Sequence, residues 1–186
     1  MMKHSEIKDK IIETASELFY RQGYNLTGIN EIIKEAGIAK ATLYSHFSTK
    51  SELCVAYLQT KNETFLKDLR YYSRQRPAGK ERVISVFDFL LEFFSTPYFN
   101  GCWCMNTVSE LPAKDLQIRE EVQTQKNNFL NLIIELLHEN LELEEGKRTV
   151  IAQQIYLLYE GAIAEANLHK KDWPIKTAKE LCQKII

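Results

Sequence analysis

The chain has 186 residues, 45% of them hydrophobic and 26% charged, and its formal net charge is −1. This composition is ordinary for a globular protein of one large or two small domains. It excludes a membrane-spanning protein, because no apolar run approaches the roughly 20 residues that a membrane helix needs. The first residues show no apolar core of a signal peptide, and four scattered cysteines do not make a secreted disulfide framework. We expect a cytoplasmic protein with reduced thiols.

Long helices are expected throughout, because only seven glycines and four prolines interrupt the chain. Apolar residues recur at helical spacing in nearly every segment. The sequence predicts an all-α fold of about nine helices, at residues 5–22, 28–35, 39–45, 50–74, 80–95, a short stretch within 101–111, 113–140, 147–169 and 175–186. Gly23 is expected to end the first helix, and the hydroxyl of Thr27 to cap the second. Trp173 and Pro174 are expected to break the chain before the last helix.

Residues 27–47 have the outline of two short helices around one tight turn. Ile29, Ile32, Ile33 and Ala36 recur at helical spacing, and Gly37 supplies the backbone freedom that a sharp turn needs. In the second helix Leu43 can anchor inward, which leaves its other residues outside. Small residues there allow close approach, Lys, Tyr and His can bond phosphate, and Thr can reach a base edge. This pattern is typical of a helix-turn-helix whose second helix enters the DNA major groove.

The run Ala-Gly-Ile-Ala-Lys-Ala-Thr-Leu-Tyr-Ser-His-Phe at residues 36–47, followed by Thr-Lys-Ser-Glu-Leu at 49–53, resembles the DNA-binding signature of the tetracycline-repressor (TetR) family. The resemblance covers about residues 5–53. It implies a bacterial one-component regulator with an N-terminal three-helix DNA-binding domain at residues 1–48. The C-terminal helical domain at residues 49–186 would bind a ligand and dimerise, with residues 49–74 as the connecting helix.

The resemblance and the pattern together give a set of expected DNA-binding residues. Ala39, Ala41 and Thr42 would lie nearest the bases. The full set is Thr27, Gly28, Ala39, Lys40, Ala41, Thr42, Tyr44, His46 and Lys50. One position departs from the family, which often has a small hydroxyl residue where Ala39 stands. The lost helix cap would cost about 1 kcal/mol.

The charge of this N-terminal part argues against strong non-specific DNA binding. Residues 1–53 contain seven Lys or Arg and seven Asp or Glu, so the segment is formally neutral. DNA binding would need the cations to be sorted to one face, and affinity for unrelated DNA should be weak because that affinity comes from phosphate neutralisation. The basic stretch of residues 67–82 is interpreted as a helix end and a solvated loop, because Arg76-Pro77-Ala78-Gly79 is a helix-breaking cluster. Thr49 and Glu52 form a capping box that starts a helix at Lys50.

A ligand cavity is expected among the apolar helices that follow. Residues 80–95 are too apolar for a surface helix. The segment from Gly101 to Leu111, of the form Gly-Cys-x-x-x-Asn followed by a small residue and Glu, resembles regulatory domains of one TetR subgroup and is expected to be buried. The residues proposed to contact a ligand are Phe87, Phe94, Trp103, Met105, Phe129, Tyr156 and Tyr159. Core packing explains the same residues equally well.

Two further features allow alternative interpretations. Cys102, near a helix start, could react with electrophiles or oxidants, whereas an inert buried thiol is the simpler interpretation. The last two helices, by resemblance, pair with those of a second subunit as a four-helix bundle, so that the protein is a homodimer. Without the resemblance they could complete the core of one subunit. Lys126 and the other charged residues in the first half of helix 113–140 are expected to be solvated.

No catalytic motif is present. The chain has no P-loop, no Gly-rich dinucleotide turn, no His-x-x-x-His pair and no nucleophile elbow, and the Cys-x-Cys pair lacks a partner at zinc spacing. We therefore predict no enzyme activity, cofactor or metal. The sequence predicts a repressor that binds palindromic operator DNA as a homodimer and is released by an unknown small molecule. The alternatives are a thiol-based sensor using Cys102 or Cys104, and a ligand-independent DNA-binding protein.

Overall fold

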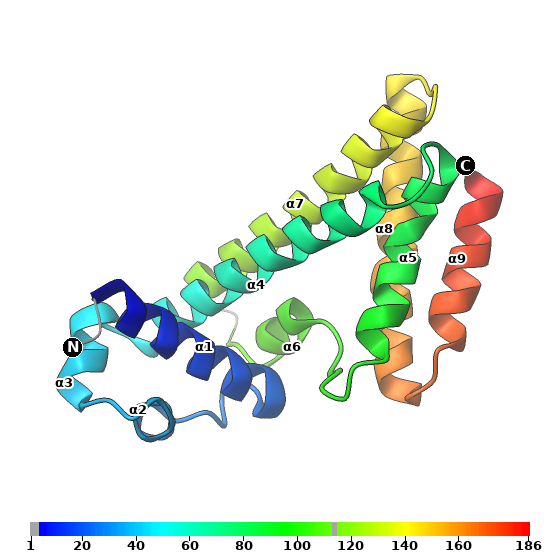
Figure 1. Cartoon of the computed structure of the whole chain (residues 1–186). Coiled ribbons are helices and arrows are strands. Elements are labelled where there is room, and N and C mark those ends of the chain that lie inside the picture. Colours follow the sequence, from blue (N-terminus) through cyan, green and yellow to red (C-terminus); the bar gives the residue numbers. More distant parts are fainter. Residues whose placement is uncertain (1–3, 113–114) are drawn as a thin grey trace. The chain divides into compact units, whose positions relative to one another are not determined.

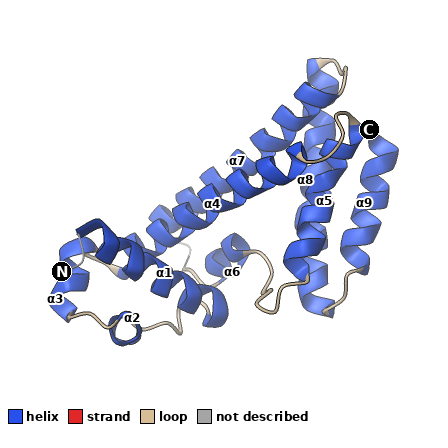
Figure 2. Cartoon of the chain, in the orientation of Figure 1, coloured by secondary structure: helices blue, strands red, loops and turns tan. Residues whose placement is uncertain are grey.

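The computed structural model describes residues 4–112 and 115–186, and within these ranges the chain forms nine helices and no strand (Figures 1 and 2). The predicted all-α fold is therefore confirmed. The helices are α1 (His4–Gln22), α2 (Ile29–Ala36), α3 (Lys40–His46), α4 (Lys50–Arg74), α5 (Lys80–Phe94), α6 (Trp103–Ser109), α7 (Leu116–Asn140), α8 (Glu145–His169) and α9 (Trp173–Ile185).

Most predicted helix ends agree with the structure, and α4 agrees at both ends. The predicted start of the seventh helix at residue 113 lies outside the described residues, and α7 is described from Leu116. The predicted break at Trp173 and Pro174 is wrong, since α9 begins at Trp173 and holds the proline in its first turn. Proline is tolerated there because N–H groups in the first turn of a helix have no acceptor within the helix, so the missing N–H of proline costs no hydrogen bond.

The chain divides into two compact units. The first unit comprises residues 1–62 and 103–124, and the second comprises residues 63–102 and 125–186. Helices α4 and α7 each contribute to both units. They lie side by side (Figure 1), linked by Gln59 to Glu121 in the first unit and by Arg70 to Glu135 in the second. Helix α6 groups with the N-terminal helices.

In the first unit, α1 packs against α2 and α2 against α3, and α1 contacts α4 through Phe19 and Tyr57. The Phe19 ring lies 5.6 Å from the rings of both Tyr24 and Tyr57, measured between centroids. The buried apolar residues at this core are Ile11, Ala15, Leu18, Phe19, Ile32, Ala36, Leu43, Phe47, Leu53, Tyr57 and Leu58. Because α2 and α3 are too short to be stable alone, this packing is what holds them in place.

The second unit has an aromatic core. The ring of Phe129 on α7 lies 4.7 Å from that of Tyr159 on α8 and 5.2 Å from that of Phe65 on α4. Phe87 on α5 lies 6.1 Å from Tyr159. Helix α9 packs on α8 and α5. In the described parts of the chain, no helix has the length and apolar character needed to cross a lipid bilayer.

Candidate nucleic-acid interface and effector site

The turn between α2 and α3 has the predicted tight geometry. Gly37 has φ 62° and ψ 38°, a left-handed conformation, and its N–H points at the carbonyls of Ile33 and Lys34. Glycine adopts this conformation without the steric cost that a side chain would add. Helix α3 then starts at Lys40, and Ala39 at its N-cap makes no side-chain cap. The missing cap follows from the alanine at this position.

Helix α3 has one buried and one exposed face. Leu43 and Phe47 are 1% and 5% exposed, whereas Tyr44 is 45% exposed. Of the other residues proposed to contact DNA from this helix and its cap, Ala39, Lys40 and Ala41 are exposed, and Thr42 and His46 are partly buried. The structure thus exposes four of these six residues on a helix anchored by its apolar residues, and it leaves Thr42 and His46 only partly accessible.

Thr27 differs from its predicted role. Its side chain is fully buried, and its hydroxyl donates to the carbonyl of Gly23 at 2.7 Å. The N-cap of α2 is instead Gly28, which makes no side-chain cap. The predicted cap is therefore wrong, because the hydroxyl bonds backward within the α1–α2 loop. Gly28 is exposed at the N-terminal end of α2, where helix N–H groups favour an anion.

The start of α4 confirms the predicted cap by Thr49, whereas the return bond of Glu52 goes to Ser48, one residue before the N-cap. The N–H of Glu52 donates to Thr49 Oγ1 at 3.0 Å, and the Glu52 carboxylate accepts from the N–H of Ser48 at 2.7 Å. Lys50 is held against the α1–α2 loop, with Nζ 4.3 Å from the centroid of the Tyr24 ring. Burial lowers the pKa of Lys50. The cation at this position is therefore placed by packing as well as by charge.

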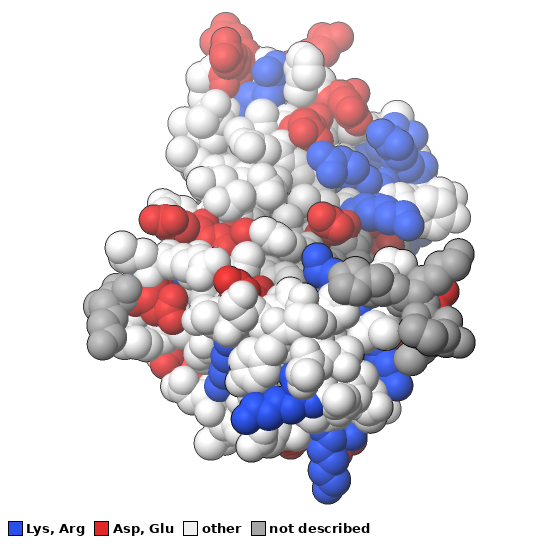
Figure 3. Space-filling model, turned by 90° about the vertical axis from the view of Figure 1, so that its left-hand side faces the viewer, with Lys and Arg blue, Asp and Glu red and all other residues white. Residues whose placement is uncertain are grey.

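Two lysines of the first unit lie over aromatic rings at α3 and its C-cap. Lys8 lies over the ring of Phe47 at 5.8 Å and Lys40 over that of Tyr44 at 5.9 Å. Two carboxylates are occupied within the unit, since Glu31 accepts from Gln22 and Glu52 caps α4. Figure 3 faces the side on which α2 and α3 lie, and toward its lower edge the surface is mostly uncharged, with its charged side chains mainly Lys or Arg. Although residues 1–53 are formally neutral, the charged side chains on this part of the surface are therefore mainly cationic.

The predicted ligand residues fall into both units. Those of the second unit come together: Phe87, Phe129 and Tyr159 are buried, Tyr156 lies 6.0 Å from Phe129, and Phe94 packs at the edge of the same core. Trp103 and Met105 belong to α6 in the first unit.

Helix α6 is not buried as a whole. Met105 is 50% exposed, whereas Cys104 and Thr107 are 3% and 4% exposed. The prediction of a wholly buried segment is therefore wrong. An apolar composition does not say which side of a short helix faces the protein, so a two-turn helix can leave an apolar residue outside.

A polar cluster adjoins the aromatic core. Lys126 Nζ lies 2.7 Å from both carboxylate oxygens of Glu160 and 3.1 Å from Cys102 Sγ. The side chains of Lys126 and Glu160 are 17% and 18% exposed. The predicted solvation of Lys126 is therefore wrong. The sequence did contain a sign that Lys126 is partly buried. Lys126 comes four residues after Val122 and three before Phe129, so it lies beside the apolar stripe of α7.

The neighbouring Tyr159 stays a neutral phenol. Burial raises its pKa well above the ordinary value, and the charges of Glu160 and Cys102 raise it further. The cluster of Cys102, Lys126 and Glu160 therefore offers an ammonium, a carboxylate and a thiol next to an aromatic wall. Such a combination suits an organic molecule with one polar end and an apolar body.

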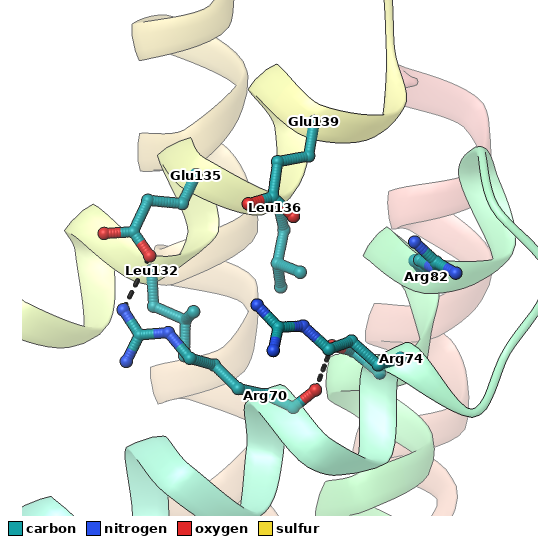
Figure 4. Close-up of a pocket in the computed structure, with 8 residues that line it drawn as sticks. Arg70, Arg74, Arg82, Leu132, Glu135, Leu136 and Glu139 are labelled. Carbon is teal, nitrogen blue, oxygen red and sulfur yellow. Dashed lines mark hydrogen bonds and ion pairs between the residues drawn. The ribbon is translucent and has the colours of Figure 1, made fainter.

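A surface pocket in the second unit lies elsewhere. It is lined by Arg70, Ser73, Arg74, Arg82, Leu132, Glu135, Leu136 and Glu139 (Figure 4). Arg70 and Glu135 form an ion pair at 2.6 Å across it. None of the predicted ligand residues lines this pocket, so it does not support the expected cavity.

Thiol labelling of the native protein is expected to modify Cys102 first. Burial raises the pKa of Cys54 and of Cys182 to about 12, so only about one molecule in ten thousand carries either thiolate at pH 8. Cys104 is almost fully buried and Cys102 only partly so. Iodoacetamide labelling followed by peptide mass spectrometry checks this order, with urea-unfolded protein as the control. Equal labelling of Cys54 in the native protein would contradict the packing described here.

Comparisons with known proteins match two separate stretches of the chain, and the second stretch includes residues 103–124 of the first unit. Residues 11–57 match the family described as bacterial regulatory proteins, tetR family, and residues 79–181 match the tetracyclin repressor-like C-terminal domain. The fatty acid metabolism regulator protein of Bacillus subtilis is 24% identical over 149 residues, which cover 78% of this chain and 75% of that protein. The transcriptional activator FasR of Mycolicibacterium smegmatis is 30% identical over 92 residues, covering 50% of this chain and 42% of that protein.

Solved structures share the whole fold. A TetR-family transcriptional regulator from Streptomyces coelicolor superposes with a TM-score of 0.86 at 26% identity, over 100% of this chain and 95% of that one. The reduced form of NemR from Escherichia coli gives a TM-score of 0.83 at 19% identity, over 97% of both chains. The second likeness shows the fold alone.

Proposed function

Because the chain belongs to the TetR family of bacterial regulatory proteins, we propose that this transcriptional regulator is a repressor that binds palindromic operator DNA as a homodimer. A small molecule bound in the C-terminal part releases it. The observation that carries the proposal is the exposed face of α3, which is anchored by buried Leu43 and Phe47 and carries Lys40, with Lys8 beside Phe47. Residues 1–48 bind DNA, and residues 49–186 bind the effector and dimerise, with residues 49–74 connecting the two functions. A protein that reads chromosomal DNA in a bacterium works in the cytoplasm.

The proposed docking places α3 in the major groove. Ala39 and Ala41 add little bulk, which lets the helix approach closely and brings Thr42 near the base edges. Lys40, Tyr44, His46 and Lys50 contact phosphates, and these contacts position the protein without reading sequence. The N-terminal end of α2 at Gly28 adds an N–H contact to the backbone. Thr27, being buried, supports the loop from inside.

The proposed dimer uses the outer faces of α8 and α9. Val150, Leu157 and Leu168 on α8 are 52%, 67% and 73% exposed. Their positions, together with the exposed Gly161 and Ala164, follow a spacing of seven, four, three and four residues. This is the spacing of a seam between packed helices. Gly161 has open space where a Cβ would stand, so another helix can approach closely.

A second copy of the chain is the partner that this face fits best. Trp173 and Leu181 of α9, at 49% and 41% exposed, add apolar surface from the neighbouring helix. A two-fold axis brings the same stripe from both subunits together, and a self-complementary apolar face meets itself in such an arrangement. A two-fold dimer also matches the two half-sites of a palindrome.

The proposed effector site is the cluster of Cys102, Lys126 and Glu160 with the aromatic residues Phe129 and Tyr156 beside it. The polar groups would bind a carboxylate or carbonyl, and the rings would contact an apolar chain. One relative is named as a fatty acid metabolism regulator, which makes fatty acyl compounds the first class to test. Binding needs to favour the released state by only about 1–3 kcal/mol to change DNA affinity 5–150-fold.

A thiol-based trigger is the second candidate function. It is favoured by the 3.1 Å approach of Lys126 Nζ to Cys102 Sγ, because a neighbouring ammonium stabilises a thiolate. Hydrogen peroxide would transfer one oxygen atom to the thiolate, giving a sulfenic acid and a hydroxide ion, which takes up a proton from the solvent to form water. Oxidation would then disturb the same cluster that a ligand would occupy.

One experiment separates these functions. DNA retained by the purified protein from a pool of genomic fragments is expected to contain a palindrome whose half-sites lie about one helical turn apart. Release from that DNA is then measured with palmitate, oleoyl-coenzyme A or hydrogen peroxide, for the wild type and for Cys102→Ser. Release by an acyl compound in both proteins supports the ligand-responsive repressor, and release by peroxide in the wild type alone supports the thiol sensor. No release by any of them favours ligand-independent binding, and no enriched DNA contradicts the proposal.

A further inference from the structure

Glu110, just after the end of α6, is bound to the loop that leads from α1 to α2. The backbone N–H of Asn25 donates to Glu110 Oε2 at 2.7 Å. The side-chain amide of Asn25 donates to the backbone carbonyl of Glu110 at 2.8 Å. These two bonds, called the Asn25–Glu110 contact below, join residues 85 positions apart in the chain. Both residues lie in the first unit.

The loop backbone leaves just enough room for the Glu110 carboxylate. Gly23 has φ +93°, and a Cβ built there would lie 2.3 Å from Glu110 Oε1. A side chain at position 23 would therefore strain the backbone and push the carboxylate away. The glycine, predicted from the sequence only to end α1, thus also provides space for a carboxylate from a distant segment.

The same loop positions two elements proposed to contact DNA. Thr27 closes the loop through its bond to Gly23, and α2 begins directly after Gly28. The Tyr24 hydroxyl lies 3.3 Å from Ser51 Oγ, and its ring lies under Lys50. The Glu110 charge also reaches Lys50, where it partly offsets the lowering of the pKa by burial. A shift of Glu110 would therefore act on α2 and Lys50 together.

Helix α6 connects this contact to the polar cluster through the chain itself. Its first residue, Trp103, directly follows Cys102, which contacts Lys126. Its seven residues span only about 10 Å, and a helix this short moves as one piece. Displacing its first turn would displace Glu110.

We propose that Glu110 is the positioning residue that holds the α1–α2 loop in the DNA-binding arrangement, and that α6 withdraws it when the Cys102–Lys126–Glu160 cluster is disturbed. This inference rests on the proposed DNA-binding function. The Glu110 carboxylate and the backbone amide of Asn25 would thus connect the polar cluster to the DNA-binding residues. The bond is charge-assisted and therefore stronger than a neutral hydrogen bond. Loss of this bond is expected to loosen the loop without unfolding the core, because both hydrogen bonds of the Asn25–Glu110 contact lie at the exposed surface.

Hydrogen exchange tests the contact without any DNA. In Glu110→Ala the amide of Asn25 is expected to exchange at least about tenfold faster. Glu110→Gln is expected to give an intermediate rate, because an amide oxygen still accepts the bond. Glu120→Ala, which removes an exposed carboxylate of α7 in the same unit, is the matched control and should leave the rate unchanged. An unchanged rate in Glu110→Ala overturns the inference.

A double-mutant cycle on DNA affinity tests the regulatory connection. Lys126→Ala disturbs the cluster and is expected to weaken operator binding about tenfold in the wild-type background, which is within the usual range of allosteric coupling. In the Glu110→Ala background, where the contact is already lost, the same substitution should weaken binding less than about twofold. Glu160→Gln serves as a second disturbance if Lys126→Ala unfolds, and circular dichroism verifies folding.

The outcomes separate this inference from the proposed function. Additive effects of the two substitutions, or unchanged affinity in folded cluster variants, overturn the inference while DNA binding stands. Faster Asn25 exchange with unchanged operator affinity also overturns it, because Glu110 would then be merely structural. Failure of the wild type to bind any DNA specifically overturns the proposed function and the inference with it.

Discussion

Replacing Tyr44 with alanine is expected to weaken operator binding at least about tenfold, by a similar factor for every operator sequence. The tyrosine is exposed on α3 beside Lys40, where its hydroxyl can donate to a phosphate. A hydrogen bond to a charged group contributes roughly 1.5–3 kcal/mol, and a dimer makes the contact twice. Titration of labelled operator by fluorescence anisotropy measures the loss.

Two comparisons make this result specific to the docking of α3. Thr42→Val should change the preferred base in each half-site, because this residue is placed at the base edges. Tyr71→Ala removes a tyrosine that is 70% exposed on α4 in the second unit, and it should leave operator affinity unchanged. If Tyr44→Ala and Thr42→Val both kept wild-type affinity and preference, the assignment of α3 to the major groove would be wrong.

The double variant Leu157→Glu with Leu168→Glu is expected to be monomeric and to bind operator at least about a hundredfold more weakly. Burying a leucine contributes roughly 1.5–3 kcal/mol, and an unpaired carboxylate within an interface adds a desolvation cost. Both residues occur twice in the proposed seam. Sedimentation velocity measures the mass, and the anisotropy titration measures binding.

A matched surface change controls for added charge. Tyr98→Glu places a carboxylate on a loop residue that is 81% exposed and outside the proposed seam. This variant should remain a dimer with wild-type operator affinity. A monomeric wild type, or a double variant that sediments as the wild-type dimer does, would refute the assignment of α8 and α9 to the subunit interface.

Local signals in the sequence predicted much of the fold. The capping box at Thr49 and Glu52 and the breaker cluster after Arg74 mark both ends of α4, because the determinants lie within a few residues of each end. Gly37 marks the turn before α3 for the same reason. The exposed face of α3 followed from the spacing of its apolar residues. The roles of the residues on that face remain predictions.

Features that depend on distant segments were not visible in the sequence. The Thr27 hydroxyl can bond either forward to the start of α2 or backward to the carbonyl of Gly23, and the packing of the loop selects the second partner. Lys126 was interpreted as solvated because its neighbours in sequence are charged, whereas Glu160 and Cys102 approach it only in the folded chain. The Asn25–Glu110 contact joins two polar residues that have no local signature. Gly23 was one indication of this contact in the sequence, because a glycine can mark a position where another group approaches the backbone closely.

The measurement that tests the central claim most directly is the affinity of the wild-type protein for DNA upstream of its own coding region, at near-physiological salt. Unrelated DNA of the same length is the comparison, and the stoichiometry is measured in the same titration. The account predicts a preference of at least about a thousandfold, with two chains bound per site. Saturation by a single chain would contradict it. Equal affinity for both DNAs would mean either that the operator lies elsewhere in the genome or that the formally neutral segment of residues 1–53 does not bind DNA specifically.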